Sequence, residues 1–416
     1  MSELLLLRSF RNRLTMFLNH RSALRCNHPT DAKMFTALAY ILAAIPLTAI
    51  CFFVLLTRRI KRESLTLIVL DLRGEFSKFV KYMETLRRIS HPPMANDVVL
   101  ALSNRPHKTL SNLYSNLLGV RIIWGGSVSS LVQQALLLQP RFLVSIRRDI
   151  SYLNPKPYRW SVVPIPEPSE FTVRRSSILK QLGVEGKWYV AISVYSPNYE
   201  AERNPQSMEK VVSLVTKGEE LAPSIDYLRD EKLQPILLGS LDAGSAHVPR
   251  AFPRLVDHFP LGSGEEVVLA AGCHYFWTDN VGAWWLGQPF QRPVMYSNLA
   301  LLPRTGLLAP NHLMLFVRYR LPDGRLLTLR ELCREKKRTS FYKAASRGEI
   351  QLVRNSPEVI VDAHREMIAR LDGTWTDDEE TVELRSRLES IFFEFPDIHP
   401  ARIPSMYLKV NSDLLN

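Results

Sequence analysis

The chain has 416 residues, of which 46% are hydrophobic and 23% charged, so it is long enough for two domains and is not disordered throughout. Its formal net charge of +12 at pH 7 favours anionic partners such as membrane phospholipid, nucleotide sugars or nucleic acid. The four cysteines are scattered with no CxxC pair, which argues against a zinc site and against a disulfide framework.

Residues 1–33 form a basic N-terminal segment. Apolar residues alternate there with arginines, among them Arg8, Arg11 and Arg13. The pattern is typical of an amphipathic helix that lies on an anionic membrane. A frayed basic terminus explains the same residues, so both interpretations stay open.

Residues 34–57 form an apolar stretch of 24 residues without a charge. A helix of this length rises about 36 Å, which is enough to cross a hydrocarbon core of about 30 Å. Residues 58–62 are basic, so the positive-inside rule places the rest of the chain in the cytoplasm, at the inner membrane. Pro46 leaves open a re-entrant or interfacial segment, and a buried soluble helix is the third alternative.

Residues 64–150 predict a first α/β domain. Strand-like apolar runs alternate with helical spacing, and this β-α-β-α-β order is typical of a parallel, doubly wound sheet. The predicted strands are 64–71, 97–103 and 120–124, and the clearest helical patterns are 73–88 and 127–138.

A proline-rich linker is predicted at 151–186, with a helix over 170–182 inside it. A second α/β domain follows at 187–355, and the tail 356–416 is helical. We expect strands at 188–195, 234–238, 274–278 and 292–296, and helices at 219–230, 358–371 and 378–393. The acidic run 377–380 reads as the solvated start of the last helix.

The most informative stretch is 267–298. Ala270 to Trp277 reads as a buried strand, Thr278-Asp279-Asn280 as a polar turn, and Val281 to Leu286 as a short helix. A second strand returns at 293–296. The first N–H groups of a helix lack internal partners and carry the positive end of its dipole, so such a turn can bind an anion. An ordinary β-α-β unit with a capped helix is the alternative.

Several stretches resemble, in the same order, a family of bacterial glycosyltransferases encoded among surface-polysaccharide genes. The resemblance covers residues 65–415. Besides 267–298, the matching stretches are WYVAISVYSP (188–197), Arg203-Asn204, SIDYLRDEKLQPILLGS (224–240), GRLLTLRELC (324–333), NSPEVIVDAHREMIARLDG (355–373) and ARIPSMYLKVNSDLL (401–415). This resemblance implies a GT-B-like fold, in which two Rossmann-like domains face a cleft: an acceptor domain at 64–150 and a donor-binding domain at 187–355.

The resemblance also implies a nucleotide-sugar donor in place of a cofactor. Metal-dependent glycosyltransferases hold the donor through an Asp-x-Asp pair, which this chain lacks, so we expect a metal-independent enzyme and no metal site. The phosphate loop GxxxxGK[ST], the dinucleotide motif GxGxxG and the hydrolase elbow GxSxG are absent as well.

Glycosyl transfer needs a stabilised leaving diphosphate, an oriented donor and a base for the acceptor hydroxyl. For the diphosphate we nominate the helix start Asn280, Val281 and Gly282, with Arg203 as the counter-charge, because a guanidinium binds two phosphate oxygens. Asp279 precedes them in the donor-binding turn, where its carboxylate would repel the diphosphate. A solvated arginine is the alternative for Arg203.

The other donor-binding candidates follow strand ends or lie where they could reach across the cleft. Asp242 could accept ribose hydroxyls, and helix capping explains Glu331 equally well. These candidates are Tyr195, Ser196, Gly239, Ser240, Asp242 and Glu331. For the catalytic base we nominate Asp71 and Glu75, which flank the turn after the first strand; a helix N-terminal carboxylate is their alternative.

The sequence therefore predicts a membrane-associated glycosyltransferase that moves a sugar from a nucleotide sugar to a lipid-linked or polysaccharide acceptor in cell-surface glycan synthesis. Other polysaccharide-assembly proteins are possible partners. The alternative is a non-catalytic GT-B-like scaffold of a polysaccharide assembly complex. Asp279 and Arg73-Gly74-Glu75 motivate it, because the family has a small Ser/Gly-rich turn and a Gly-His pair there. Nucleic acid is not an expected partner, since no basic-aromatic stripe or binding motif is present.

Overall fold

The computed structural model describes the chain in segments, which fall in two compact units, Met1–Leu153 and Asn154–Asn416. The described residues are 67–71, 98–102, 109, 112–113, 121–124, 165–194, 218–239, 252–260, 263–279, 286–300, 311–334, 341, 344–345, 347–395 and 401–416. The predicted membrane segment 34–57 and the basic segment 1–33 lie outside them.

The first unit contains a three-stranded parallel sheet. Its strands are β1 (Leu67–Asp71), β2 (Val98–Leu102) and β3 (Arg121–Trp124), in the order β1-β2-β3. Each is a short run of mainly apolar residues, as buried parallel strands are. The strands and the parallel pairing predicted for this part of the chain are therefore confirmed.

The second unit is built on a five-stranded parallel sheet in the order β5-β4-β6-β7-β8. The strands are β4 (Tyr189–Ser193), β5 (Gln234–Leu237), β6 (Tyr275–Thr278), β7 (Val294–Leu299) and β8 (Leu313–Phe316). All residues of β6, β7 and β8 are buried, so both faces of the sheet are covered. The α/β class is confirmed.

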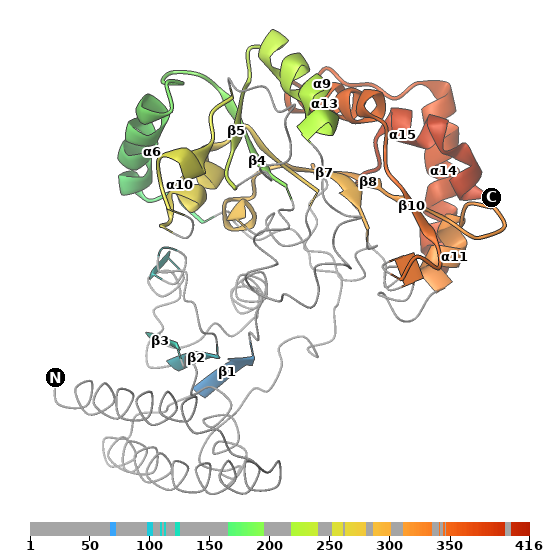
Figure 1. Cartoon of the computed structure of the whole chain (residues 1–416), viewed down its shortest axis with the longest axis horizontal. Helices are drawn as coiled ribbons and strands as arrows, with labels where there is room; N and C mark the ends of the chain where they lie inside the picture. Colours follow the sequence, from blue (N-terminus) through green and yellow to red (C-terminus); the bar gives the residue numbers. More distant parts are fainter. Residues whose placement is uncertain are drawn as a thin grey trace, which may run out of the picture. The chain divides into compact units, whose positions relative to one another are not determined.

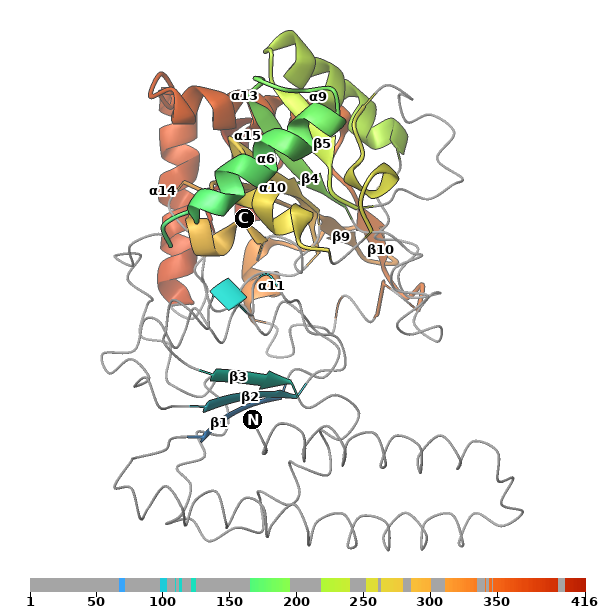
Figure 2. The same cartoon turned by 90° about the vertical axis from the view of Figure 1, so that its left-hand side faces the viewer.

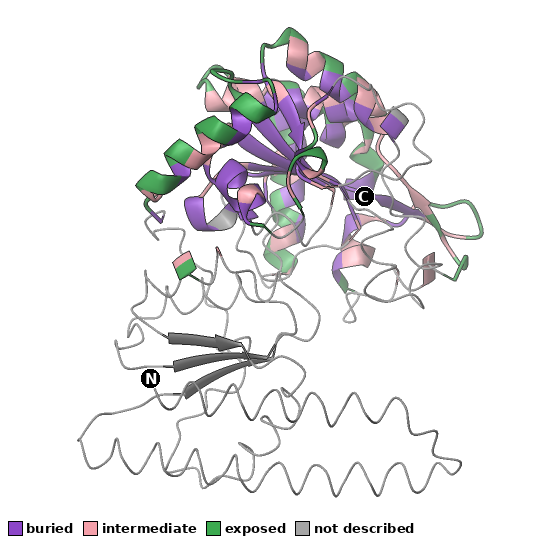
Figure 3. Cartoon of the chain, turned by 60° about the vertical axis from the view of Figure 1, so that its left-hand side comes forward, coloured by how far each residue is buried: buried purple, intermediate pink, exposed green. Residues whose placement is uncertain are grey.

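Helices cover the two faces of this sheet. The pair α6 (Ser169–Gln181) and α10 (Glu265–Gly272) packs together on one face, and the pair α9 (Gly218–Asp230) and α13 (Pro357–Leu371) on the other (Figures 1 and 2). Figure 3 shows the buried strands between helices whose outer faces are exposed. The side chains agree with this arrangement, because Tyr189 donates a hydrogen bond to Leu269 of α10, whereas Tyr275 contacts His364 of α13.

The C-terminal segment completes the edge of the sheet. After α14 (Glu379–Glu394), the backbone at Arg402 pairs in parallel with Leu313 of β8. The segment then forms α15 (Ser405–Val410) and the short 3-10 helix η8 (Ser412–Leu415). Arg318 anchors this end, because its guanidinium donates to both carboxylate oxygens of Asp413 at 3.0 and 2.9 Å. An exposed strand edge is thereby shielded.

A small accessory layer follows β8. The strands β9 (Arg318–Arg320) and β10 (Gln351–Val353) pair antiparallel, and α11 (Leu329–Arg334) lies between them in the sequence. They share a small apolar core centred on Val317, Tyr319 and Leu327. Two further 3-10 helices are η5 (Leu255–Asp257) and η7 (Gln288–Phe290).

One element was predicted wrongly, since Ala270–Gly272 is helical and not part of a strand. The run from Glu265 to Gly272 forms α10, and β6 begins only at Tyr275. The helix is buried almost throughout, so its apolar residues carry no amphipathic period that would separate it from a strand. Gly264, with φ of 107°, and the Glu266 carboxylate, which accepts from the Gly264 N–H at 3.1 Å, set its start.

Candidate functional site

The strand order of the five-stranded sheet marks one end of it as the place for a ligand. The first strand of this sheet, β4, lies inside it. The next strand, β5, pairs on one side of β4, and β6, β7 and β8 follow one another on the other side. The connections that follow β4 and β5 therefore leave in different directions. In open α/β sheets, ligands bind beyond the carboxyl ends of the strands at such a switch point. Here that point lies between the ends of β4 and β6.

The end of β6 is held by buried polar contacts. Trp277 donates from Nε1 to Oγ of Ser297 at 2.8 Å, which ties β6 to the end of β7. Thr278 is fully buried, and Asp279 is the next residue. The predicted polar turn thus begins where β6 ends at the switch point. Its remaining residues, Asn280, Val281 and Gly282, lie outside the described residues.

On the α13 side of β6, a neutral histidine fills the core. His364 is fully buried, its Nδ1 lies 2.7 Å from the Tyr275 hydroxyl, and its ring meets Trp277 edge to face at 4.4 Å between centroids. Burial lowers the pKa of His364 to about 3, so the ring is uncharged at neutral pH. These contacts fix Trp277 and hence the end of the strand that leads into the turn.

The end of β7 contains a strained residue. The pairing of β7 with β8 shifts register between Tyr296 and Leu299, and within this bulge Asn298 adopts φ of 58°. Asn298 is only 4% exposed. Its Oδ1 accepts from the backbone N–H of Asn355 at 2.8 Å and from Asn355 Nδ2 at 3.0 Å. Asn355 Nδ2 also donates to the Phe316 carbonyl at 3.0 Å, so one side chain joins the ends of β7 and β8.

The start of α13 lies beside these strand ends but is already capped. Ser356 Oγ accepts from the Val359 N–H at 3.5 Å. A hydrogen bond from the Ser356 hydroxyl, and then one from the backbone N–H of Glu358 itself, lower the pKa of the Glu358 carboxyl. That carboxylate therefore occupies the position at the helix N-terminus that an anion would take.

Three of the predicted site residues lie at the carboxyl ends of strands, as expected. Asp71 is the last residue of β1, Gly239 lies two residues past β5, and Asp279 follows β6. A Cβ built on Gly239 would meet no atom of the described residues within 4 Å. Asp71 belongs to the first unit and the other two to the second.

Glu331, the fourth described candidate, closes a capping box at the start of α11. Its Oε2 accepts from the Thr328 N–H at 2.8 Å, and Arg325 binds both carboxylate oxygens at 2.9 Å. These bonds lower the pKa of Glu331, the Arg325 contact most. The interpretation of Glu331 as a helix-capping residue is thus confirmed. The remaining predicted residues lie outside the described part of the chain: Glu75, Tyr195, Ser196, Arg203, Ser240, Asp242, Asn280, Val281 and Gly282.

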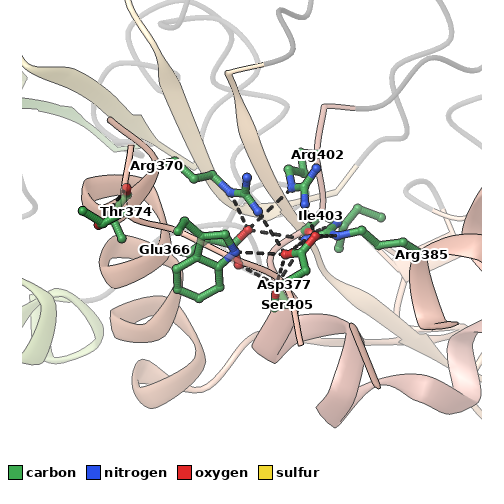
Figure 4. Close-up of polar contacts among 10 residues, drawn as sticks. Glu366, Arg370, Thr374, Asp377, Arg385, Arg402, Ile403 and Ser405 are labelled. Carbon is green, nitrogen blue, oxygen red and sulfur yellow. Dashed lines mark hydrogen bonds and ion pairs between the residues drawn. The ribbon is translucent and has the colours of Figure 1, made fainter. Parts of the chain in front are cut away.

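The largest ion-pair cluster of the described residues lies at the opposite, amino end of the sheet (Figure 4). Glu366 of α13 accepts from Arg370 at 2.8 Å and from the Ser405 N–H at 2.6 Å. Asp377 accepts from Arg385 and from Trp375 Nε1, both at 2.9 Å, and pairs with Arg402. Burial alone would raise the pKa of Asp377, but the hydrogen bonds from Arg385 and Trp375 hold it well below its usual range.

This cluster corrects the prediction for the acidic run 377–380. Asp378 does cap α14 as expected, accepting from the Thr381 N–H at 2.9 Å. Asp377 is not a solvated residue, since only 14% of its side chain is exposed. Every carboxylate oxygen of the cluster binds residues of its own unit, so we assign the cluster a structural role.

The sequence reasoning did not predict the positive φ of Asn298. The only local indication of this conformation is the residue type, because asparagine is among the few residues that tolerate positive φ. No described group of three or more histidine, cysteine, aspartate or glutamate side chains could hold a metal ion.

Among the described helices, none is both long and apolar enough to cross a membrane. No protein-family model and no curated protein matches the chain. Among solved structures, ADP-heptose lps heptosyltransferase II of E. coli is similar with 14% sequence identity and a TM-score of 0.32. The similarity covers 56% of this chain and 85% of that one.

Proposed function

We propose that the chain is a GT-B-like glycosyltransferase that transfers a sugar from a nucleotide sugar to a glycan or lipid-linked acceptor. One observation carries the proposal: the polar turn that the sequence nominates for the donor diphosphate begins at Asp279, where β6 ends beside the switch point of a parallel sheet. Gly239 supports it, because this residue lies just past the carboxyl end of β5, the strand that pairs with β4 on the side away from β6.

In this proposal the donor lies over the carboxyl ends of β4, β5 and β6. The N–H groups that follow Asp279, with the guanidinium of Arg203, stabilise the charge that builds up on the leaving diphosphate. Basic residues and a helix N-terminus take the role that a metal ion has in other glycosyltransferases, so the reaction proceeds without one.

The acceptor hydroxyl attacks the anomeric carbon of the donor sugar. The new C–O bond forms as the bond from that carbon to the diphosphate oxygen breaks, and a carboxylate takes the hydroxyl proton. We assign the proton to Asp71 or Glu75. Asp71 is the last residue of β1, at the carboxyl end of a parallel strand, which is the end at which open α/β sheets bind ligands.

The enzyme works at the inner membrane in this proposal, with its main domains in the cytoplasm. The apolar segment 34–57 and the basic residues around it would hold it beside a lipid carrier. Fractionation of cells that express the full chain tests this part, and release of the protein by salt alone would rule out a spanning anchor.

The central experiment is a thermal-shift titration of the full-length protein with a panel of nucleoside diphosphates and nucleotide sugars. A ligand that binds only the folded state at a hundred times its Kd stabilises it by about 2.7 kcal/mol, so at least one of them should raise Tm by several degrees. The shift should persist in EDTA, and Arg203→Ala should abolish it. The matched control is Arg347→Ala, which removes an exposed arginine of the accessory layer and should leave the shift unchanged.

Turnover separates the enzyme from a scaffold that keeps the fold. With the nucleotide sugar that shifts Tm, the wild type should release nucleoside diphosphate when a suitable acceptor is supplied. Asp71→Asn should lower that rate at least a hundredfold if Asp71 is the base, without altering the shift. Binding without release by the wild type would favour the scaffold, and no shift with any nucleotide would refute the donor site.

A further inference from the structure

We draw no further inference here: the strongest candidate, the surface patch at the amino end of the five-stranded sheet where the exposed Trp188 ring meets His274 edge to face, carries none, because nothing in the described part of the chain shows what covers it.

Discussion

The two ends of the five-stranded sheet use polar residues in opposite ways. At the amino end, Glu366 and Asp377 fill their carboxylate oxygens with bonds from three arginines, Trp375 and Ser405. At the carboxyl end, Asn298 has a strained backbone, and its side-chain oxygen accepts two hydrogen bonds from Asn355. Ion pairs thus hold the amino end, whereas neutral hydrogen bonds hold the carboxyl end.

Helix α13 connects these two ends. Asn355 and Ser356 at its start contact the ends of β7 and β8, and Glu366 in its later turns belongs to the ion-pair cluster. Mutations at the amino end should therefore lower stability without changing ligand affinity, whereas mutations at the carboxyl end should be able to change ligand affinity as well.

The largest effect should come from breaking the cluster at the amino end. Glu366→Gln leaves three guanidinium groups with a single carboxylate. Since only 1% of the Glu366 side chain is exposed, we expect the free energy of unfolding to fall by about 3–5 kcal/mol. Urea unfolding measures it. The matched control is Glu389→Gln on the exposed side of α14, which should cost less than about 0.5 kcal/mol. A small loss in Glu366→Gln would mean that solvent already screens the cluster.

The next largest effect should be a loss of stability in mild acid. Burial lowers the pKa of both His364 and His312 to about 3, so each is neutral in the folded protein but binds a proton in the unfolded chain below pH 6.5. The unfolded state therefore takes up more protons as the pH falls, and stability drops. Each histidine should cost about 1.5 kcal/mol between pH 6.5 and pH 5.

Unfolding by urea at several pH values measures this slope. His364→Leu removes one titrating group, so its slope over this range should be shallower than that of the wild type by that amount, whatever its stability at pH 7. The carboxyls with lowered pKa, such as Asp377, lose their contribution only at more acidic pH. Parallel curves for the wild type and His364→Leu would mean that His364 is protonated in the folded state.

A smaller effect is expected from the contact that ties β6 to β7 near the carboxyl end. Ser297→Ala leaves the buried Trp277 N–H without its acceptor, which should cost about 1–3 kcal/mol. If the contact also positions the turn after β6, the affinity for the donor should fall as well. Ser297→Thr, which keeps the hydroxyl, is the control for both measurements. Equal ligand affinity in the wild type and in Ser297→Ala would limit this contact to stability.

The sequence predicts the framework of the sheet because its strands are short apolar runs with turn residues at their ends. The strands β1 to β7 were each expected within a few residues of their bounds. We did not predict β8, although its residues LMLF are an apolar run of the same kind after Pro310-Asn311; its pairing with β7 and with Arg402 defines it. The sequence pattern misassigns the start of α10 because a fully buried helix has no polar face.

The candidate site is less predictable because its geometry depends on residues far apart in the sequence. Asp279 follows from local pattern, since a polar turn between a strand and a helix is readable. The conformation of Asn298 depends on Asn355, 57 residues away, and on a bulge against β8. The same is true of Asp377, whose acidic neighbours resemble a solvated helix start although Arg402 and Ser405 enclose it. Sequence spacing contains no record of such contacts.

The smallest effect should come from Glu331, a described donor candidate whose carboxylate is engaged in a capping box and an ion pair. Its carboxylate caps α11 and pairs with the exposed Arg325, so Glu331→Ala should cost about 1 kcal/mol, mostly from the lost cap. Arg325→Ala removes only the surface ion pair and should cost less than about 1 kcal/mol. If Glu331 acts only as a cap, neither variant should change the nucleotide Kd. A tenfold loss of affinity in Glu331→Ala alone would mean that the carboxylate also reaches the donor, and that the carboxyl end of the sheet extends its binding surface to α11.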